Sequence, residues 1–204
     1  MKQSKAKVAV AASGDFWLSP RYRASAWNAL HLDIESEVDW PMAIDIVEDR
    51  IMGRFVRWID QIEDVRFSGF AVMALDCLLI ETLVGFITGR PSKGPDALLE
   101  GQLTDCEFHF TKDEAEWFRK NVRNGIIHDT ETRGRCVIQR GAPSGGILTT
   151  KCDSISLNRN AFHGALIREL GAWLAKLRAG DKVLRSNMKL RMNQIIRRHG
   201  ETVE

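Results

Sequence analysis

The chain has 204 residues, of which 44% are apolar and 27% are charged. This balance is typical of a globular protein with a buried core, and it excludes a collagen-like repeat or a fully disordered chain. At roughly 100–200 residues per domain, the length fits one domain with a small extension. The net charge is only +2, so any binding of nucleic acid must come from a local basic surface.

Cysteine usage and the apolar segments favour a cytoplasmic protein. The four cysteines form no C-x-x-C pair, which is typical of free thiols in a reducing compartment. The apolar run at 8–12 is shorter than the hydrophobic part of a signal peptide. The most apolar window, 67–87, contains Asp76 and Glu81, and two carboxylates argue against a membrane span. We therefore expect no membrane partner.

Residues 1–40 are predicted to form an N-terminal appendage. Ser19 and Pro20 are typical of the start of a short helix. Apolar and polar residues alternate from Leu30 to Trp40, which predicts a strand-like segment with one buried face. Its acidic side could bind a metal ion or a basic partner, but we interpret it as a solvated strand face.

Residues 41–204 are predicted to form the main domain, which is mainly α-helical. Apolar residues recur every three or four positions over 41–62 and indicate a first helix. The segment 67–88 is apolar nearly all round and indicates a second helix in the centre of the fold. Gly89 and Pro91 should end it.

A capping box predicts where the third helix begins. Thr111 is followed three residues later by Glu114, and these side chains can satisfy the first backbone amides of a helix. Its apolar stripe should end near His128. A fourth helix is predicted over 158–180.

Between the third and fourth helices the sequence predicts a β-hairpin insertion at about 135–152. Two short β-type runs, 135–140 and 147–152, flank a segment rich in glycine. Symmetric pairing of these runs would put Cys136 opposite Cys152. We interpret this as a cross-strand pair of small apolar residues, with a redox disulfide as the alternative.

The last predicted helix is strongly basic. Asp181 can cap it, and residues 176–199 contain eight lysines and arginines but one acidic residue. Such a helix could hold the backbone of RNA. Charge runs of this kind are more often solvated faces, and we favour that interpretation.

Several standard catalytic motifs are absent from the sequence. The glycines at 141–146 lack the G-K-[ST] ending of a P-loop, and there is no G-x-S-x-G elbow. Cys106 and His109 have ligand-like spacing, but no second pair of ligands stands at a matching distance. We therefore expect neither a metal ion nor a cofactor.

The remaining candidate motif is at the end of the third helix. Arg123 is followed directly by the polar Asn124 and five positions later by His128. The helix before it is apolar and contains acidic residues. This pattern resembles the HEPN superfamily (higher eukaryotes and prokaryotes nucleotide-binding), a helical bundle with an Arg, a polar residue and a His at this spacing. The resemblance covers roughly residues 41–198.

The resemblance implies a fold and a function. The fold would be a HEPN-like helical bundle, to which the hairpin insertion and the N-terminal appendage are additions. The protein would be a homodimeric, metal-independent endoribonuclease in bacterial antiviral defence or a toxin–antitoxin system. It would leave 2′,3′-cyclic phosphate and 5′-hydroxyl ends on RNA. The alternative is a non-catalytic HEPN module that binds RNA, a nucleotide or a cognate antitoxin protein.

By that resemblance each residue of the motif has a role. Arg123 would hold the scissile phosphate, since a guanidinium forks onto phosphate oxygens, and His128 would be the acid and base. Asn124 would hold a phosphate or turn the end of the helix. Glu81 would orient Arg123, with Asp76 as the competitor, because an acid in an apolar helix requires a partner. The alternative is purely structural: an ion pair for the arginine and a helix cap for the histidine.

Helical geometry limits how the motif can act. At about 100° per residue, positions five apart differ by about 140°, so Arg123 and His128 do not share one face of a regular helix. Either the helix loosens at Gly125 or ends before His128, or the cleft is composite and His128 meets the Arg123 of a second subunit.

Overall fold

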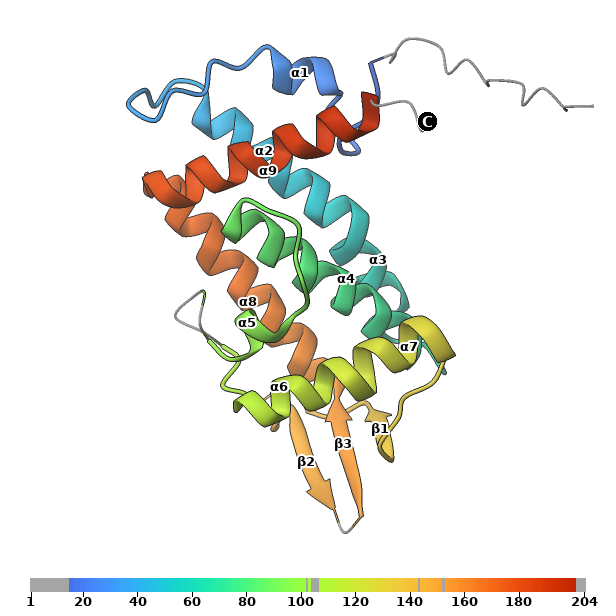
Figure 1. The fold of residues 1–204 in the computed structure, drawn as a ribbon. Coiled ribbons are helices and arrows are strands. Elements are labelled where there is room, and N and C mark those ends of the chain that lie inside the picture. Colours follow the sequence, from blue (N-terminus) through green and yellow to red (C-terminus); the bar gives the residue numbers. More distant parts are fainter. Residues whose placement is uncertain (1–14, 102, 104–106, 143, 152, 201–204) are drawn as a thin grey trace, which may run out of the picture.

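The structure is a computed structural model that describes residues 15–101, 103, 107–142, 144–151 and 153–200, and this part of the chain is mainly helical, with a small sheet at one end (Figure 1). The helical elements are α1 (Ala24–Asn28), α2 (Trp40–Ile51), the π-helical η1 (Met52–Val56), α3 (Arg57–Ile62), α4 (Gly69–Thr88), α5 (Asp96–Leu99), α6 (Lys112–Phe118), the π-helical η2 (Arg119–Arg123), α7 (Asn124–Asp129), α8 (Arg159–Arg178) and α9 (Lys182–Gly200). The strands are β1 (Cys136–Gln139), β2 (Leu148–Lys151) and β3 (Ser154–Asn158). The predicted mainly α fold class is confirmed.

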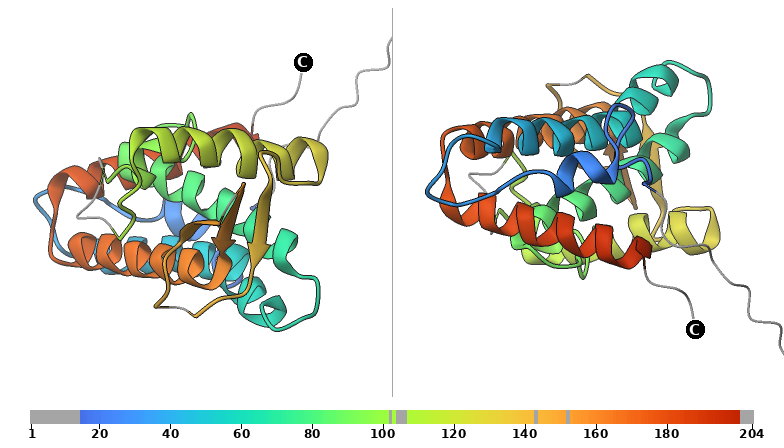
Figure 2. Two further views of the ribbon diagram at one scale, coloured as in Figure 1. Left: turned by 90° about the horizontal axis from the view of Figure 1, so that it is seen from below. Right: turned by 90° about the horizontal axis from the view of Figure 1, so that it is seen from above.

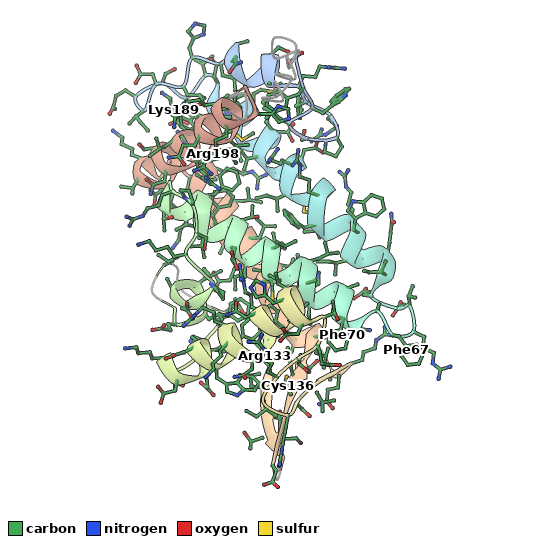
Figure 3. All side chains as sticks on the ribbon, turned by 45° about the vertical axis from the view of Figure 1, so that its right-hand side comes forward. Phe67, Phe70, Arg133, Cys136, Lys189 and Arg198 are labelled. Atoms are coloured by element: carbon green, nitrogen blue, oxygen red, sulfur yellow. The ribbon has the colours of Figure 1, made fainter. Side chains whose placement is uncertain are left out.

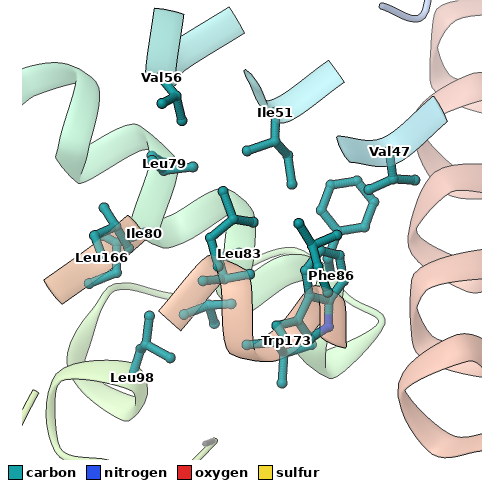
Figure 4. Close-up of a cluster of buried hydrophobic side chains, with 14 of the residues drawn as sticks. Val47, Ile51, Val56, Leu79, Ile80, Leu83, Phe86, Leu98, Leu166 and Trp173 are labelled. Carbon is teal, nitrogen blue, oxygen red and sulfur yellow. The ribbon is translucent and has the colours of Figure 1, made fainter. Parts of the chain in front are cut away.

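Helix α4 is the centre of the core, as its apolar sequence predicts. Leu79, Ile80 and Leu83 are fully buried, and they meet side chains from α2, η1, α5 and α8 (Figure 4). Phe86 packs against Trp173 of α8, with ring centroids 5.9 Å apart. Burying each such side chain stabilises the fold by roughly 1.5–3 kcal/mol. By length and composition α4 could also cross a membrane, but most of it is buried within the protein.

The first predicted helix is present but contains a π-helical turn. Elements α2, η1 and α3 run without a break from residue 40 to residue 62. At Gly53 an ideal Cβ would lie 2.2 Å from Cγ of Pro20. The N-terminal segment therefore packs directly against the backbone of η1, and only glycine leaves room for it.

The third predicted helix begins at its capping box and is also interrupted by a π-helical turn. The amide of Glu114 donates to Oγ1 of Thr111 at 3.2 Å, and the amide of Thr111 donates to Oε2 of Glu114 at 2.8 Å. The helix continues through η2 and α7 to Asp129, and Thr130 ends it in the left-handed region with φ 57°. The predicted start is confirmed.

The predicted hairpin between residues 135 and 152 is wrong. Strand β1 pairs with β3 in parallel, and β2 pairs with β3 in antiparallel, so β3 is central and β1 does not touch β2. The side chain of Asn158, at the end of β3, holds the segment that follows β1: its Oδ1 accepts from the amide of Gly141 and its Nδ2 donates to the carbonyl of Ala142. Cys136 is opposite Ile155. Cys152 lies outside the described residues.

The strand predicted from Leu30 to Trp40 does not form. These residues make turns up to the start of α2. Their backbone groups bond to nearby side chains: the amide of His31 donates to Asp39 at 2.7 Å, and the indole of Trp40 donates to the carbonyl of Asp33 at 2.8 Å. Such local bonds compete with a strand, which would also need a partner strand.

The helix start predicted at Ser19 and Pro20 is also displaced. A tight turn forms there, in which Oγ of Ser19 accepts from the amide of Tyr22, and α1 begins only at Ala24. Helix α1 lies between α2 and α9 (Figure 2, right). Its Trp27 donates to the side chain of Asn193 at 2.8 Å.

The fourth and last helices form at their predicted places. The side chain of Asn158 caps α8 by accepting from the amide of Ala161 at 3.3 Å. Helix α9 is capped by Asp181, whose Oδ1 accepts from the amide of Leu184 at 2.9 Å. The described ends of the chain meet, because the ring of Phe16 stacks on His199 of α9.

Candidate functional site

Arg123 is held by two neighbours at the junction of η2 and α7. Its Nε donates to Oε1 of Glu81 on α4 at 2.6 Å, and its Nη1 donates to Oδ1 of Asn124 at 3.0 Å. The pairing with Glu81 expected from the sequence is therefore present. The side chains of Arg123 and Glu81 keep 25% and 20% of their surface exposed. The guanidinium is thus fixed in direction while part of it remains open to solvent.

His128 lies in the last turn of α7 and is exposed. It is next to Asp129, which forms an ion pair with Arg133. The hydrogen bond from Arg133 lowers the pKa of Asp129, and the nearby His128 acts in the same direction. The imidazole of His128 is therefore exposed at the surface and is not buried. An acidic and a basic side chain, Asp129 and Arg133, lie nearby.

One chain does not bring Arg123 and His128 to the same face. The chain is regular α-helix from Asn124 to Asp129, so the looser helix expected at Gly125, or an end before His128, is absent. The departure from regular α-helix lies earlier, in the π-helical η2. At about 100° per residue, the two side chains still leave the helix about 140° apart.

Gly125 anchors this helix on the loop that follows it. An ideal Cβ at Gly125 would lie 2.5 Å from the carbonyl oxygen of Glu131 and 3.3 Å from the amide of Arg133. That amide donates to the carbonyl of Asn121 at 2.8 Å. The loop therefore crosses directly over the helix, and the contact fixes the end that carries the motif.

Asp76 is not a partner of Arg123. It is fully buried, and its Oδ1 lies 2.7 Å from Nδ1 of His163 on α8. Burial raises the pKa of Asp76. Burial alone would lower the pKa of His163, but the hydrogen bond and the charge of Asp76 raise it. His163 is not among the residues that the sequence singled out, although an acid in an apolar helix signals that some partner is present.

An apolar surface adjoins Arg123 and is called the α4–α7 patch below. It consists of Phe70 and Leu78 on α4 and Ile127 on α7, which are exposed by 38%, 48% and 41%. Leu78 and Ile127 are each about one helical turn from the Arg123–Glu81 ion pair. Figure 3 shows Phe70 on the side of α4 that faces α7. Exposed apolar side chains beside a polar site are what a protein interface would cover.

The basic helix α9 finds much of its counter-charge within the chain. Arg185, which is only 2% exposed, pairs with Glu37, and Lys182 pairs with Glu35. Both acids belong to the segment interpreted as a solvated strand face. The hydrogen bond from Arg185 is the main cause that lowers the pKa of Glu37. The acidic segment therefore neutralises Lys182 and Arg185 of the basic helix.

Metal ligands do not gather in the described part of the chain: no group of three or more His, Cys, Asp or Glu side chains there could hold an ion. His109 lies on the wall of a surface pocket beside Glu107 and Arg168. Cys106, with which it was considered, lies outside the described residues.

Comparisons of the chain with protein-family models, with curated proteins and with solved structures find no match. The side-chain geometry therefore carries the functional argument.

Proposed function

We propose that the protein is a metal-independent endoribonuclease that acts as a homodimer, as the resemblance to HEPN proteins implies. Arg123 and His128 are the catalytic residues, Glu81 orients the arginine, and Asn124 supports it. The observation that carries the proposal is a guanidinium that two neighbours fix while it stays partly open to solvent, on the same helix as an exposed imidazole. A cytoplasmic setting in bacterial antiviral defence or a toxin–antitoxin system belongs to the same proposal.

The arrangement at Arg123 suits a phosphate of RNA. Glu81 accepts from Nε of Arg123, and Asn124 accepts from Nη1. These two hydrogen bonds fix the orientation of the guanidinium and therefore the direction of its other terminal nitrogen, Nη2. A guanidinium is permanently charged and can stabilise the extra negative charge of a pentacoordinate phosphorus. Prior orientation by Glu81 reduces the entropy lost when the phosphate binds.

The reaction is an internal transfer on the RNA and requires no metal ion. The ribose 2′-oxygen attacks phosphorus, and the bond from phosphorus to the 5′-oxygen breaks. One imidazole takes the proton of the 2′-hydroxyl, and a protonated imidazole gives a proton to the leaving 5′-oxygen. The products are a 2′,3′-cyclic phosphate and a 5′-hydroxyl.

A second copy of the chain can bring a guanidinium and an imidazole into one cleft, which a single helix does not do. Arg123 and His128 point apart on the continuous helix that η2 and α7 form, whereas a twofold axis at the α4–α7 patch would set the His128 of one subunit near the Arg123 of the other. A twofold interface is self-complementary, so one apolar patch serves both subunits. Two imidazoles in one cleft can then divide the roles of base and acid.

The test is cleavage of a mixed RNA in excess EDTA. We expect cyclic-phosphate ends from the wild type and at least a hundredfold less product from each of Arg123→Ala and His128→Ala. A general acid or base contributes about 10²–10⁴-fold, and a group that stabilises the charge of the transition state contributes about 10²–10³-fold. Arg133→Ala is the matched control, because it removes a neighbouring arginine outside the motif. Its rate should stay within about twofold of the wild type.

Mixing the two inactive variants tests the composite site. Dimers formed from Arg123→Ala and His128→Ala chains contain one complete Arg/His pair if the pairs form between subunits. We expect the mixture to regain part of the activity, whereas each variant alone stays inactive. Recovery fails if both residues act within one chain. RNA that the wild type binds but leaves intact would contradict the enzyme and favour a non-catalytic HEPN module, which can also bind an antitoxin protein.

A further inference from the structure

A small cavity is lined by residues of α2, η1, α4 and α9. In Figure 1, α9 crosses α2 at the opposite end of the molecule from the sheet. Its volume is about 180 Å³, and three arginines line it. The lining residues are Arg50, Ile51, Arg54, Phe55, Thr82, Phe86, Arg191 and Ile195. The cavity therefore combines apolar walls with three guanidinium groups from two different parts of the chain.

Carbonyl groups of the N-terminal segment position two of these arginines. Nη1 of Arg50 donates to the carbonyl of Leu18 at 2.5 Å, and Nη2 of Arg54 donates to the same carbonyl at 3.2 Å. A carbonyl oxygen carries no formal charge. These bonds fix the directions of the guanidinium groups and leave their charges uncompensated.

Gly85 of α4 leaves room for the side chain of Arg191, the third arginine of the cavity. At Gly85 of α4 an ideal Cβ would lie 3.2 Å from Nε of Arg191. The side chain of Arg191 therefore lies against the bare backbone of α4, and its Nη1 donates to the side chain of Gln194 at 3.3 Å. An alanine at position 85 would force the side chain of Arg191 to shift by a few tenths of an ångström.

The three arginines have no acidic partner in the part of the chain that the structure describes. Burial, followed by the charges of Arg54 and Arg191, lowers the pKa of Arg50 to about 10. The contrast with Arg185 is clear, because that buried arginine pairs with Glu37. Arg50 and Arg191 are half-buried, and Arg54 is exposed. Like charges gathered in this way without a counter-ion repel each other and favour a bound anion.

We propose that this cavity is a binding site for a phosphate group, either inorganic phosphate or the terminal phosphate of a mononucleotide. Guanidinium groups match phosphate oxygens in charge and shape. Cavities for drug-sized ligands measure roughly 300–1,000 Å³, so a volume of about 180 Å³ admits one small anionic group. The charges of Arg50, Arg54 and Arg191 exceed that of a phosphate dianion, so its charge is fully compensated. This site is independent of the ribonuclease proposal.

The test is binding of inorganic phosphate, 5′-AMP and adenosine to the full-length protein by calorimetry, at constant ionic strength in a chloride buffer. We expect saturable binding of phosphate or of 5′-AMP and none of adenosine. Tighter binding of 5′-AMP assigns the site to a nucleotide, and equal binding assigns it to free phosphate. Adenosine that binds as well as 5′-AMP would overturn the proposal.

Substitutions place the binding in this cavity. We expect Arg191→Met to weaken phosphate binding at least about tenfold, which corresponds to the loss of about one charge-assisted contact. Lys112→Met is the matched control, because it removes the same charge from an exposed position of α6, and its affinity should equal that of the wild type. Equal affinities of these two variants would overturn the proposal.

A measurement of unfolding temperature separates a lost site from a lost fold. Phosphate should raise the unfolding midpoint of the wild type, because a ligand of the native state stabilises it. Without phosphate, Arg191→Met should unfold at or above the wild-type temperature, since one of three repelling charges is gone. Gly85→Ala keeps all three charges but displaces Arg191, and it should also reduce the gain from phosphate. A gain from phosphate that is undiminished in both variants would contradict the site.

Discussion

At the scale of single residues, two acids of α4 have opposite environments although they are five positions apart. Glu81 is partly exposed and pairs with a permanently charged guanidinium. Asp76 is sealed in the core against an imidazole, and its Oδ2 has no hydrogen-bond partner in the described part of the chain. The first arrangement can present a cation to a ligand. The second can only change the stability of the fold, because no substrate reaches it.

The buried pair predicts how stability depends on pH. The folded-state pKa of Asp76 is raised by burial, and that of His163 is raised by Asp76 and, more weakly, by Asp60 and Glu63. Both shifts mean that the folded state holds protons more firmly than the unfolded chain. The contribution of His163 is therefore complete below its unfolded pKa, about 6.5, and is lost as the pH rises through its folded pKa.

We expect the wild type to lose free energy of unfolding, on the order of 1 kcal/mol, between pH 6 and pH 8.5 relative to the double variant Asp76→Asn, His163→Gln. Urea unfolding at the two pH values measures this difference. His31→Gln is the control, since its side chain is 97% exposed, and it should leave the pH dependence unchanged. Parallel pH profiles for the wild type and the double variant would show that the pair does not titrate in this range.

At the scale of secondary-structure elements, local sequence signals predicted the helix ends at Thr111 and Asp181 correctly and the strand pairing incorrectly. The capping box at Thr111 and the cap at Asp181 formed as predicted. Each involves groups at most three residues apart. The sheet instead depends on β3, whose central place is set by a partner on each side. Because β1 and β3 are parallel, the chain between them must cross over. The glycine-rich segment near residue 144 indicates a turn but does not indicate which strands pair.

The glycines of the helices give a test at this scale. Gly125→Ala should destabilise the fold by roughly 1–3 kcal/mol, because the new methyl group would lie 2.5 Å from the carbonyl oxygen of Glu131. Gly171→Ala in α8 is the matched control, since nothing lies within 4 Å of its ideal Cβ. It should stabilise the protein by roughly 0.5–1 kcal/mol, as expected for alanine in a helix. Urea unfolding of both variants decides, and equal effects would contradict the close contact at Gly125.

At the scale of the whole molecule, the distribution of charge is decided by packing. The acidic segment before α2 lies against α9 and neutralises Lys182 and Arg185. Arg191, farther along the helix, lines the cavity instead. Packing thus separates the cations of α9 that pair with the acidic segment from the one that lines the cavity.

The α4–α7 patch predicts the assembly state. Leu78→Asp should convert the proposed homodimer to a monomer and abolish RNA cleavage, because a carboxylate at a twofold interface meets its own copy. Light scattering measures the mass, and the RNA assay measures the activity. Val183→Asp is the control, since Val183 is 69% exposed at the start of α9 and far from the patch. A Leu78→Asp variant that remains dimeric would place the interface elsewhere.

The sequence by itself determined the helical class, the central place of α4 and the caps at Thr111 and Asp181, and it favoured Glu81 over Asp76 as the partner of Arg123. Each follows from apolar periodicity, from groups close in the chain, or from the need of an acid in an apolar helix for a partner. Only the tertiary structure decided the strand order, the Asp76–His163 pair and the gathering of Arg50, Arg54 and Arg191. These depend on segments far apart in sequence, and the free energy of their contacts appears only when packing brings them together.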